Sequence, residues 1–308
     1  MKRAKAAGAR SRDPGHLTVR EAAGFLRIKE RKLYDLVARG EVPHTRAGSK
    51  ILFLPAELER WLAGRASGGG ARAPLPATIA GSHDPLLEWA VRESRCGLAL
   101  LTQGSMDGVE RLLSGGACAA LIHIPAPDLL DFNRPLAEKR FRGRDIVLVE
   151  WARREQGLLV RKGNPKRIRA LADLAKRGVE VVLRQEGAGS RALFERLAAR
   201  DGLEVSRLRV PRPPEMTESD LAAAIQRGEA DAGLGARAAA RIFGLDFVPL
   251  AVERLDLAVL RAAWFDPPLQ ALWSFARGAR FAEHARALTG YDLAGLGAVT
   301  WNSGPEVK

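Results

Sequence analysis

Three short turns rich in Gly and Ser, at residues 80–85, 103–108 and 185–191, could bind an anion. Each follows a strand-like apolar run and opens a helical stretch, so backbone amides and the positive end of the helix dipole would converge on one point. Taken singly, each turn could also be an ordinary helix cap formed by Ser or Asp. Their recurrence at strand ends, where α/β sheets place ligands, favours a common site for an oxyanion. None of the three has the residue pattern of a nucleotide-binding loop.

The elements that must position these turns begin at about residue 77. From there onward, short apolar runs alternate with amphipathic helical stretches, which is the pattern of a parallel sheet wrapped by helices. The sequence therefore predicts an α/β domain with enough strands for two lobes. We expect strands near residues 77–80, 97–101, 118–123, 146–151, 157–160, 180–183, 205–210, 230–233, 247–250 and 256–260.

The first quarter of the chain predicts three short helices and a β-hairpin. Thr18 and Glu21 fit a capping box, in which each side chain binds the backbone amide of the other residue, so a helix should begin there. A second, basic helix is expected over residues 29–39. Two extended runs within residues 42–53 predict a β-wing, and a third helix over 55–65 would cover the small core.

The positive charge of the chain is concentrated in the same quarter. The whole sequence has a formal net charge of +13; residues 1–76 carry +9, from 16 Lys and Arg against 7 Asp and Glu, and residues 77–308 carry +4, from 33 against 29. A segment with this surplus is expected to meet a polyanion, although a solubilising basic tail would have the same composition.

Other features of the sequence argue against several classes of protein. Cys96 and Cys118 have no CxxC spacing and no nearby His cluster, so they predict neither a disulfide framework nor a metal site. The chain has no secretory signal and no apolar run of about 18 residues, so we expect a cytoplasmic protein that does not contact a membrane. No cofactor is expected. An enzyme that uses Ser105 and His123 stays open as an alternative, although no metal set, nucleophile elbow or paired-carboxylate motif is present.

Four segments of the first quarter carry a family resemblance: Leu17-Thr18-Val19-Arg20-Glu21-Ala22-Ala23, Leu33-Tyr34-Asp35-Leu36-Val37, Gly40-Glu41-Val42-Pro43 and Ala56-Glu57-Leu58-Glu59-Arg60-Trp61-Leu62. They resemble the excisionase-type winged helix-turn-helix domain related to the MerR family. The resemblance implies binding to double-stranded DNA through basic side chains on the second helix and the wing, which reach phosphates or base edges. Tyr34 could equally be a core residue, and the module could alternatively bind protein. The residues assigned to the DNA interface are Arg20, Lys29, Arg31, Lys32, Tyr34, Arg46, Ser49 and Lys50.

A second resemblance spans residues 77–295. It rests on the three turns above and on segments that include Ala120-Leu121-Ile122-His123, Arg154-Glu155-Gln156-Gly157-Leu158, Gly163-Asn164-Pro165, Glu215-Met216-Thr217-Glu218-Ser219, Gly228-Glu229-Ala230-Asp231-Ala232-Gly233-Leu234-Gly235 and Gly244-Leu245-Asp246-Phe247-Val248-Pro249-Leu250. These resemble the cytoplasmic periplasmic-binding-protein-like domain of the molybdate-binding class. The resemblance implies two α/β lobes in a type II-like arrangement, with molybdate, tungstate or a molybdenum-cofactor-related ligand in the cleft between them.

The same resemblance assigns the ligand contacts. Ser82, Ser105 and the turn from Gly187 to Arg191 are the implied contacts, although this turn reads Gly-Ala-Gly-Ser-Arg and so has one hydroxyl fewer than is usual in the family. His83, His123 and Thr217 would suit a larger or organic anion as readily. His123 could instead be a core residue, and Arg184 and Arg191 could pair with Glu186 or Glu195. The assigned ligand-binding residues are Ser82, His83, Ser105, His123, Gly187, Gly189, Ser190, Arg191 and Thr217.

Together these patterns predict a one-component transcriptional regulator that binds DNA and senses a small anionic ligand, most simply molybdate or tungstate. It is expected to be a homodimer, because helix-turn-helix proteins usually read two half-sites. The alternatives are a regulator that senses an organic anion and a molybdate carrier or storage protein. The expected domains are a basic tail (1–15), the DNA-binding domain (16–65), a flexible linker (66–76) and the two-lobed domain (77–308), with one lobe from 77–155 and 251–308 and the other from 157–250.

Overall fold

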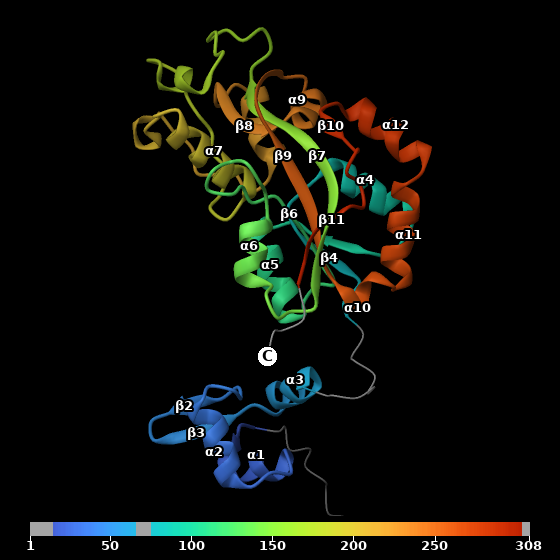
Figure 1. Cartoon of the computed structure of the whole chain (residues 1–308). Coiled ribbons are helices and arrows are strands. Elements are labelled where there is room, and N and C mark those ends of the chain that lie inside the picture. Colours follow the sequence, from blue (N-terminus) through green and yellow to red (C-terminus); the bar gives the residue numbers. More distant parts are fainter. Residues whose placement is uncertain (1–14, 66–74, 304–308) are drawn as a thin grey trace, which may run out of the picture. The chain divides into compact units, whose positions relative to one another are not determined.

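The computed structural model describes residues 15–65 and 75–303 (Figure 1). Contacts between Cα atoms divide the chain into two compact units, Met1–Pro74 and Leu75–Lys308. The expected basic tail and most of the expected linker lie outside the described residues. In the described part of the chain, no helix is both long enough and apolar enough to cross a membrane.

The N-terminal unit consists of three helices and a small antiparallel sheet of strand order β1-β3-β2. The capping box predicted at the first helix is confirmed: the Thr18 amide donates to Glu21 Oε2 at 2.8 Å, and the Glu21 amide donates to Thr18 Oγ1. The core includes Leu33, Phe53 and Leu58, all without exposed surface. The elements are β1 (Leu17–Thr18), α1 (Val19–Phe25), α2 (Glu30–Ala38), β2 (Thr45–Ala47), β3 (Lys50–Phe53) and α3 (Pro55–Arg65).

The C-terminal unit is an α/β fold around one eight-stranded sheet of order β10-β7-β9-β6-β4-β5, with β8 and β11 also paired to β7. Its strands are β4 (Thr78–Gly81), β5 (Ala99–Leu101), β6 (Ala119–Ile122), β7 (Ile146–Val160), β8 (Ala232–Ala236), β9 (Asp246–Leu260), β10 (Tyr291–Asp292) and β11 (Val299–Asn302). Its helices are α4 (Pro85–Ser94), α5 (Ser105–Ser114), α6 (Arg134–Arg140), α7 (Gly189–Arg200), α8 (Glu218–Gln226), α9 (Arg237–Phe243), α10 (Arg261–Trp264), α11 (Pro267–Ala276) and α12 (Ala279–Leu288), with short 3-10 helices at Leu171–Ala175 and Val205–Arg207.

The sheet is mixed, so the expectation of a parallel sheet is only partly right. Strands β4, β5 and β6 pair in parallel, whereas β9 pairs antiparallel with both β6 and β7. The reason is the path of the chain, which leaves the first lobe along β7 and returns to it along β9 in the opposite direction. We call the part that contains β4, β5 and β6 lobe 1, and the part that contains β8, α7 and α8 lobe 2.

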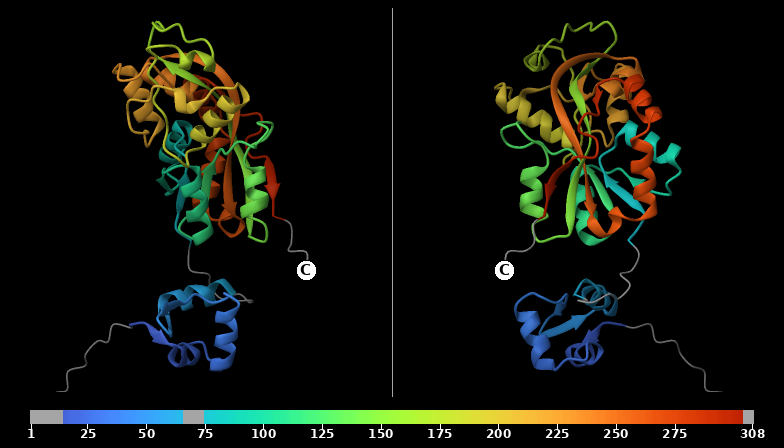
Figure 2. Two further views of the ribbon diagram at one scale, coloured as in Figure 1. Left: turned by 90° about the vertical axis from the view of Figure 1, so that its left-hand side faces the viewer. Right: turned by 45° about the vertical axis from the view of Figure 1, so that its right-hand side comes forward.

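Two long strands connect the lobes, and each contains two segments that were expected to be separate strands. Residues 146–151 and 157–160, expected as separate strands, belong to the single 15-residue strand β7, and 247–250 and 256–260 likewise belong to β9. Both views of Figure 2 show β7 and β9 side by side from one lobe into the other. Their register shifts between Glu150 and Ala152 and between Gln156 and Gly157, where the ladder passes from one lobe to the next.

Each lobe has its own hydrophobic core, and lobe 1 has helices on both faces of its sheet. In lobe 1, α4, α11 and α12 lie on one face and α5 and α6 on the other (Figure 1), around buried side chains such as Trp151 and Trp273. In lobe 2, Leu193 and Phe194 of α7 pack against β8 and the end of β7. The chain therefore positions the turns before α4, α5 and α7 on two separately packed bodies.

Two further expected strands are absent from lobe 2. Residues 180–183 make only isolated bridges, such as Val181 with Ala232, and do not form a strand. Residues 205–207 form a 3-10 helix, and Leu208 alone of residues 205–210 is buried. An apolar run with one buried side chain cannot fill both faces of a sheet, so the prediction of a strand at 205–210 is wrong.

Candidate functional site

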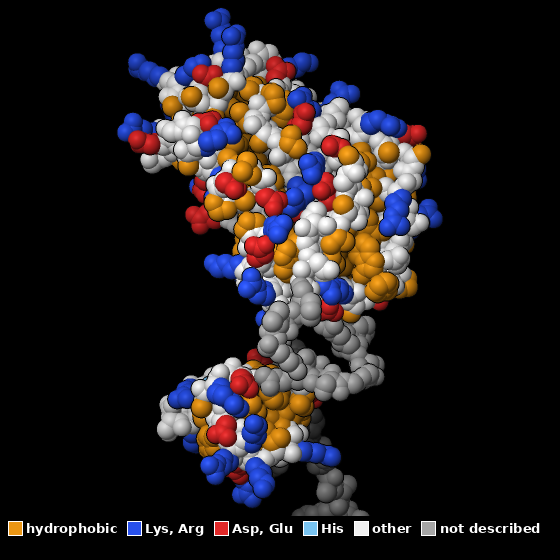
Figure 3. Space-filling view, viewed as in Figure 1, with side chains coloured by type: hydrophobic (Ala, Val, Ile, Leu, Met, Phe, Trp, Pro, Cys, Tyr) orange, Lys and Arg blue, Asp and Glu red, His pale blue; other side chains and the backbone are white. Residues whose placement is uncertain are grey.

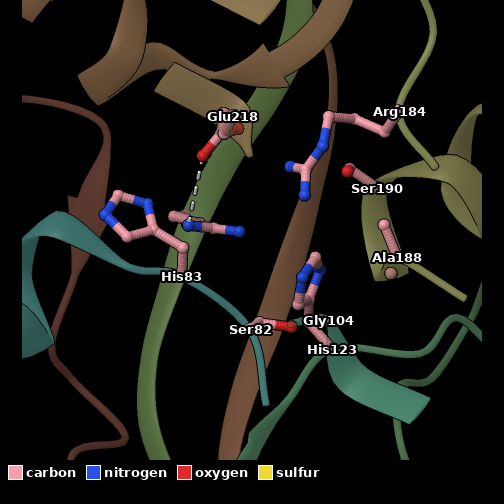
Figure 4. A pocket seen from close by; sticks show the side chains of 10 residues that line it. Ser82, His83, Gly104, His123, Arg184, Ala188, Ser190 and Glu218 are labelled. Atoms are coloured by element: carbon pink, nitrogen blue, oxygen red, sulfur yellow. Dashed lines mark ion pairs between the residues drawn. The ribbon is translucent and has the colours of Figure 1, made fainter. Parts of the chain in front are cut away.

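A pocket lies between the two lobes, at the ends of β4 and β6 and the start of α7 (Figure 4). Its volume outside all atoms is about 240 Å³, part of it open to solvent. Figure 4 shows Arg184 and Ser190 of lobe 2 on one side, with His83 across from them and Ser82 and His123 below. The lining residues are Ser82, His83, Gly104, His123, Arg154, Arg184, Ala188, Gly189, Ser190 and Glu218.

The first turn of α7 presents free hydrogen-bond donors to this pocket. Gly189 and Ser190 are the first two residues of the helix, so their amides have no carbonyl partner within it. Ser190 is only 3% exposed, yet its buried Oγ has no hydrogen-bond partner among the described residues. A buried hydroxyl without a partner is costly, and a bound ligand that accepts its hydrogen bond would remove that cost.

Arg184 places a positive charge at the same place. Its Nε and Nη2 donate to the carbonyl oxygens of Glu215 and Met216, at 3.2 and 2.9 Å. Among residues 75–303, no carboxylate lies within ion-pair distance of its guanidinium. Burial lowers the pKa of Arg184, an effect that the Glu218 carboxylate opposes and that Arg154 reinforces. A desolvated cation without a direct counter-ion favours the binding of an anion.

Arg154, in contrast to Arg184, is surrounded by carboxylates. It lies on β7 and is 3% exposed. Its Nε pairs with Glu253 of β9, and its Nη1 lies 3.1 Å from Asp84 Oδ2 and 3.8 Å from Glu218 Oε2. Burial opposes its charge, but the three carboxylates raise the pKa of Arg154 well above its ordinary value. Arg154 therefore joins both lobes and both long strands in one buried network.

Glu253 continues this network toward the pocket. Its carboxylate has no exposed surface and accepts hydrogen bonds from Gln156 Nε2 at 2.8 Å and from the ring of His123, whose Nδ1 lies 2.8 Å from Oε2. Although burial works against ionisation, Arg154 and His123 lower the pKa of Glu253 to about 2. His123 is thus both a pocket residue and part of the buried network.

This pKa predicts how stability depends on acid. Because the pKa of Glu253 falls from 4.5 to about 2 on folding, its contribution, roughly 3 kcal/mol, is complete above pH 4.5 and is lost as the pH falls toward 2. We expect the free energy of unfolding of Glu253→Gln to be lower at pH 7 and to fall less steeply below pH 4.5, measured by urea unfolding between pH 7 and 2.5. Glu138→Gln, at a surface carboxylate, is the control. Parallel curves for wild type and Glu253→Gln would contradict the assignment.

Ser82 and Ser105 meet at the floor of the pocket. Their hydroxyl oxygens lie 2.7 Å apart, and Ser105 Oγ also accepts the backbone amide of His123 at 3.3 Å. Ser105 has no exposed surface and does not line the pocket, so it positions Ser82. Its hydroxyl contacts the His123 backbone, while the His123 ring binds Glu253, so the Ser105 and His123 side chains do not form a nucleophile and base pair.

Two hydrogen bonds hold the lobes together beside the pocket. Gln185 Nε2 donates to the carbonyl of Gln103 at 2.9 Å, and the Met106 amide donates to the carbonyl of Gly187 at 3.4 Å. A Cβ on Gly189 would come within 2.7 Å of His123, so the start of α7 fits against β6 only without a side chain there. The lobes are therefore closed on each other at this edge.

The structure brings together five of the nine residues assigned from sequence to the ligand: Ser82, His83, His123, Gly189 and Ser190 line one pocket, with Ser105 directly behind them. The other three lie outside its lining. The carbonyl of Gly187 accepts the Met106 amide in the hydrogen bond between the lobes. Arg191 pairs with Glu195 at 2.6 Å, which is one of the alternatives left open by the sequence. Thr217 caps α8 by accepting the Asp220 amide.

Three charged residues of the pocket are absent from that assignment: Arg154, Arg184 and Glu218. Arg154 and Glu218 lie in segments that carry the family resemblance, and Arg184 was considered only as a partner of nearby glutamates. The position of Arg184 and Glu218 relative to the predicted elements could have indicated a place in the site. Arg184 follows the apolar residues 181–183 directly, and Glu218 is the first residue of α8. Within residues 15–65 and 75–303, no group of three or more His, Cys, Asp and Glu side chains is placed to hold a metal ion.

The residues assigned to DNA lie on the surface of the N-terminal unit. All eight are exposed, including Tyr34 at 50%, so the alternative of a core tyrosine is wrong. None of the six cations among them forms an ion pair within the described residues 15–65. Lys29 occupies the N-cap position of α2, Arg31 and Lys32 follow in its first turn, and Arg46 and Lys50 lie on the β2–β3 hairpin. Figure 3 shows Lys and Arg side chains over much of the visible face of this unit.

Comparison with known proteins identifies both parts of the chain. Residues 17–66 match the family model of a helix-turn-helix domain, and residues 88–277, more than half of the chain, match that of the PBP superfamily domain. The uncharacterized protein YvgK of Bacillus subtilis (strain 168) is 27% identical over 265 residues, which cover 79% of this chain and 85% of that protein.

A solved structure agrees with the fold of the larger unit. A substrate-binding protein from Clostridium perfringens with bound phosphate aligns with a TM-score of 0.53 and 14% identity, over 68% of this chain and 96% of that chain. The helix-turn-helix and PBP families are binding folds and not enzymatic ones, so the enzyme alternative is not supported. The chain belongs to the PBP superfamily and carries, before its PBP domain, a helix-turn-helix domain.

Proposed function

We propose that the protein is a one-component transcriptional regulator, which binds double-stranded DNA through its helix-turn-helix domain and a small anion through its PBP domain. The observation that supports this most strongly is that one chain carries both a surface suited to DNA phosphates and a pocket suited to a small anion. One is formed by the start of α2 and the β2–β3 hairpin, whose five assigned cations form no ion pair among the described residues and suit phosphates. The other is a pocket in which, among the described residues, Arg184 has no carboxylate partner and neither Ser190 Oγ nor the first amides of α7 have a hydrogen-bond partner.

Molybdate or tungstate is the inorganic effector that the family resemblance favours, and the helix start with its buried hydroxyl suits any compact oxyanion. An organic anion, such as one related to the molybdenum cofactor, is the alternative. The pocket supports an anionic group in either case, because Arg184 has no direct carboxylate partner among residues 75–303.

A regulator of this kind acts where the DNA is, so we place it in the cytoplasm, and we propose a homodimer that reads two half-sites. Ligand binding changes DNA affinity only if one conformation binds the ligand better than another. Lobe closure offers such a difference, because Gln103 and Gln185 of opposite lobes touch directly beside the pocket.

Thermal melting tests the ligand half of the proposal. We expect the melting temperature of the purified protein to rise with one or more members of a panel of molybdate, tungstate, sulfate, phosphate and small organic acids. A ligand at 100 times its Kd adds about 2.7 kcal/mol, which corresponds to several degrees. The same ligand should change the affinity for duplex DNA. An anion that binds to a protein without affinity for DNA would instead favour a carrier or storage protein.

Arg184→Gln is expected to abolish the ligand-induced rise in melting temperature. Loss of the charged partner should weaken anion binding by about 2 kcal/mol or more, or roughly 30-fold. The melting temperature without ligand should change little, because removal of a desolvated charge without a direct ion-pair partner offsets the loss of the hydrogen bonds to the carbonyls of Glu215 and Met216.

Arg191→Gln is the matched comparison, since it removes the same charge from a residue that pairs with Glu195 outside the pocket. It should retain most of the ligand-induced rise. If Arg191→Gln abolished the ligand-induced rise and Arg184→Gln retained it, Arg191 would be the ligand contact, as expected from sequence.

A further inference from the structure

The anion pocket contains a carboxylate that a bare oxyanion would meet. Glu218 is 3% exposed, lines the pocket, and has its Oε1 fixed by the amide of Ala236. Its Oε2 is free of hydrogen bonds among the described residues and lies 3.8 Å from Arg154 Nη1. A fully deprotonated dianion is repelled by this oxygen, whereas a ligand with an OH or NH group can donate to it.

The charge balance of the site points the same way. Two guanidinium groups, of Arg154 and Arg184, stand against the three carboxylates of Asp84, Glu218 and Glu253, so the guanidinium and carboxylate groups of the site together carry a net charge of −1. A bare dianion would bring this total to −3 at a site with little water, which is costly. A ligand that carries an ammonium or hydroxyl donor beside its acidic group adds less charge and satisfies Glu218.

A second cavity continues the pocket on the far side of His83. It shares Ser82 and His83 with the anion pocket and is otherwise lined by residues of lobe 1: Asp84, Leu87, Glu88, Leu100 and Thr102. We call it the side groove. Its volume is about 260 Å³, close to the lower end of the range of small-molecule sites. A tetrahedral oxyanion leaves such a groove empty.

His83 stands between the two cavities with one ring nitrogen unused. Its Nε2 lies 3.2 Å from Glu88 Oε2, while Nδ1 is buried without a hydrogen-bond partner among the described residues. Figure 4 shows the His83 ring beside Glu218 and across the pocket from Arg184 and Ser190. Glu218 and His83 therefore both line the pocket that Arg184 enters, and His83 also lines the side groove.

We propose that the effector is an organic acid with an amino or hydroxyl group: the acidic group binds Arg184 and Ser190, the donor group binds Glu218, and the remaining body passes His83 into the side groove. This inference rests on the proposed anion-sensing function and names its ligand class. Bare oxyanions, molybdate, tungstate and sulfate among them, are then weak ligands of the wild-type protein.

Titration calorimetry with four defined probes tests the inference: sulfate, molybdate, inorganic phosphate and O-phosphoethanolamine, at pH 8. Hydrogen phosphate matches sulfate in size and charge but keeps one proton to donate. We expect phosphate to bind at least about tenfold more tightly than sulfate or molybdate, and O-phosphoethanolamine more tightly still, because it adds an ammonium group.

Two variants separate the parts of the site. Glu218→Gln keeps an oxygen for the Ala236 amide but removes the charge, so it should reduce the preference for phosphate over sulfate to within about threefold. Thr102→Trp fills the side groove, so it should weaken an N-benzyl derivative of O-phosphoethanolamine, whose ring extends beyond the amino group, while leaving O-phosphoethanolamine itself and inorganic phosphate unchanged; Thr102→Ser is its control. Melting temperatures without ligand verify that each variant is folded.

The outcomes distinguish the two levels of the argument. If molybdate or sulfate binds as tightly as phosphate in the wild type, and Glu218→Gln changes nothing, the organic-acid inference is overturned while anion sensing stands. If none of the four probes binds to the wild type or to Glu218→Gln, anion sensing fails, and the inference fails with it.

Discussion

Replacing Arg154 by methionine is expected to lower the free energy of unfolding of the PBP domain by about 3–5 kcal/mol. Arg154 is the shared counter-ion of Glu253, Asp84 and Glu218, all of them buried, and the substitution leaves the three carboxylates facing one another. The expected loss comes from these uncompensated charges more than from the lost contacts. Urea unfolding followed by tryptophan fluorescence measures it, because Trp151 lies three residues away on β7 and is fully buried.

Arg134→Met provides the control for this variant. Arg134 pairs with Glu138 at 3.0 Å on the exposed side of α6, so its removal should change stability by less than about 1 kcal/mol. Equal losses for Arg134→Met and Arg154→Met would mean that the buried network contributes no more than a surface pair, and the role of Arg154 in joining the lobes would have to be abandoned.

Local rules were sufficient to predict the N-terminal unit from sequence. The capping box at Thr18, the helices and the hairpin depend on residues close together in the chain, and the structure has all of them. The α/β class of the larger unit was predictable for a similar reason, because apolar runs and amphipathic stretches alternate visibly. Helix starts after strands also placed Ser82 and Ser190 in one pocket.

Strand continuity was not predictable, because it depends on contacts between distant residues. The polar run from Arg153 to Gln156 has the composition of a loop, yet it continues β7 across the lobe boundary. Its buried members, Arg154 and Gln156, are tolerated there because Glu253 of β9, about a hundred residues later, binds both. The sequence shows the polar side chains but not the partner that compensates their burial.

The assignment of Arg191 in place of Arg184 has an equally simple cause. Successive residues of a helix point about 100° apart, so when Ser190 faces the pocket the next residue, Arg191, turns toward Glu195. Arg184 lies before the turn, where the backbone is not helical, and its direction is set by hydrogen bonds to the carbonyls of Glu215 and Met216. No periodicity in the sequence reports such long-range anchoring.

Replacing Lys29, Arg31 and Lys32 by alanine is expected to weaken binding to duplex DNA by about two orders of magnitude at low ionic strength. These cations stand at the start of α2, exposed and without ion pairs among the described residues, where the helix dipole adds to their attraction for phosphate. Each lost phosphate contact should make the plot of log K against log salt concentration shallower by about one unit, or about three in all. Fluorescence anisotropy of a labelled duplex across a salt series measures both quantities.

The matched control removes the same charge from the PBP domain, by replacing Lys139, Lys162 and Arg177, which are also exposed and unpaired among the described residues. Both triple variants lower the net charge from +13 to +10, so non-specific attraction to a polyanion falls equally in the two. Only the α2 variant loses contacts that depend on the position of the charges. A clear difference in salt slope between the variants therefore assigns DNA binding to the helix-turn-helix domain, whereas equal slopes would mean that overall charge, and not this helix, holds the DNA.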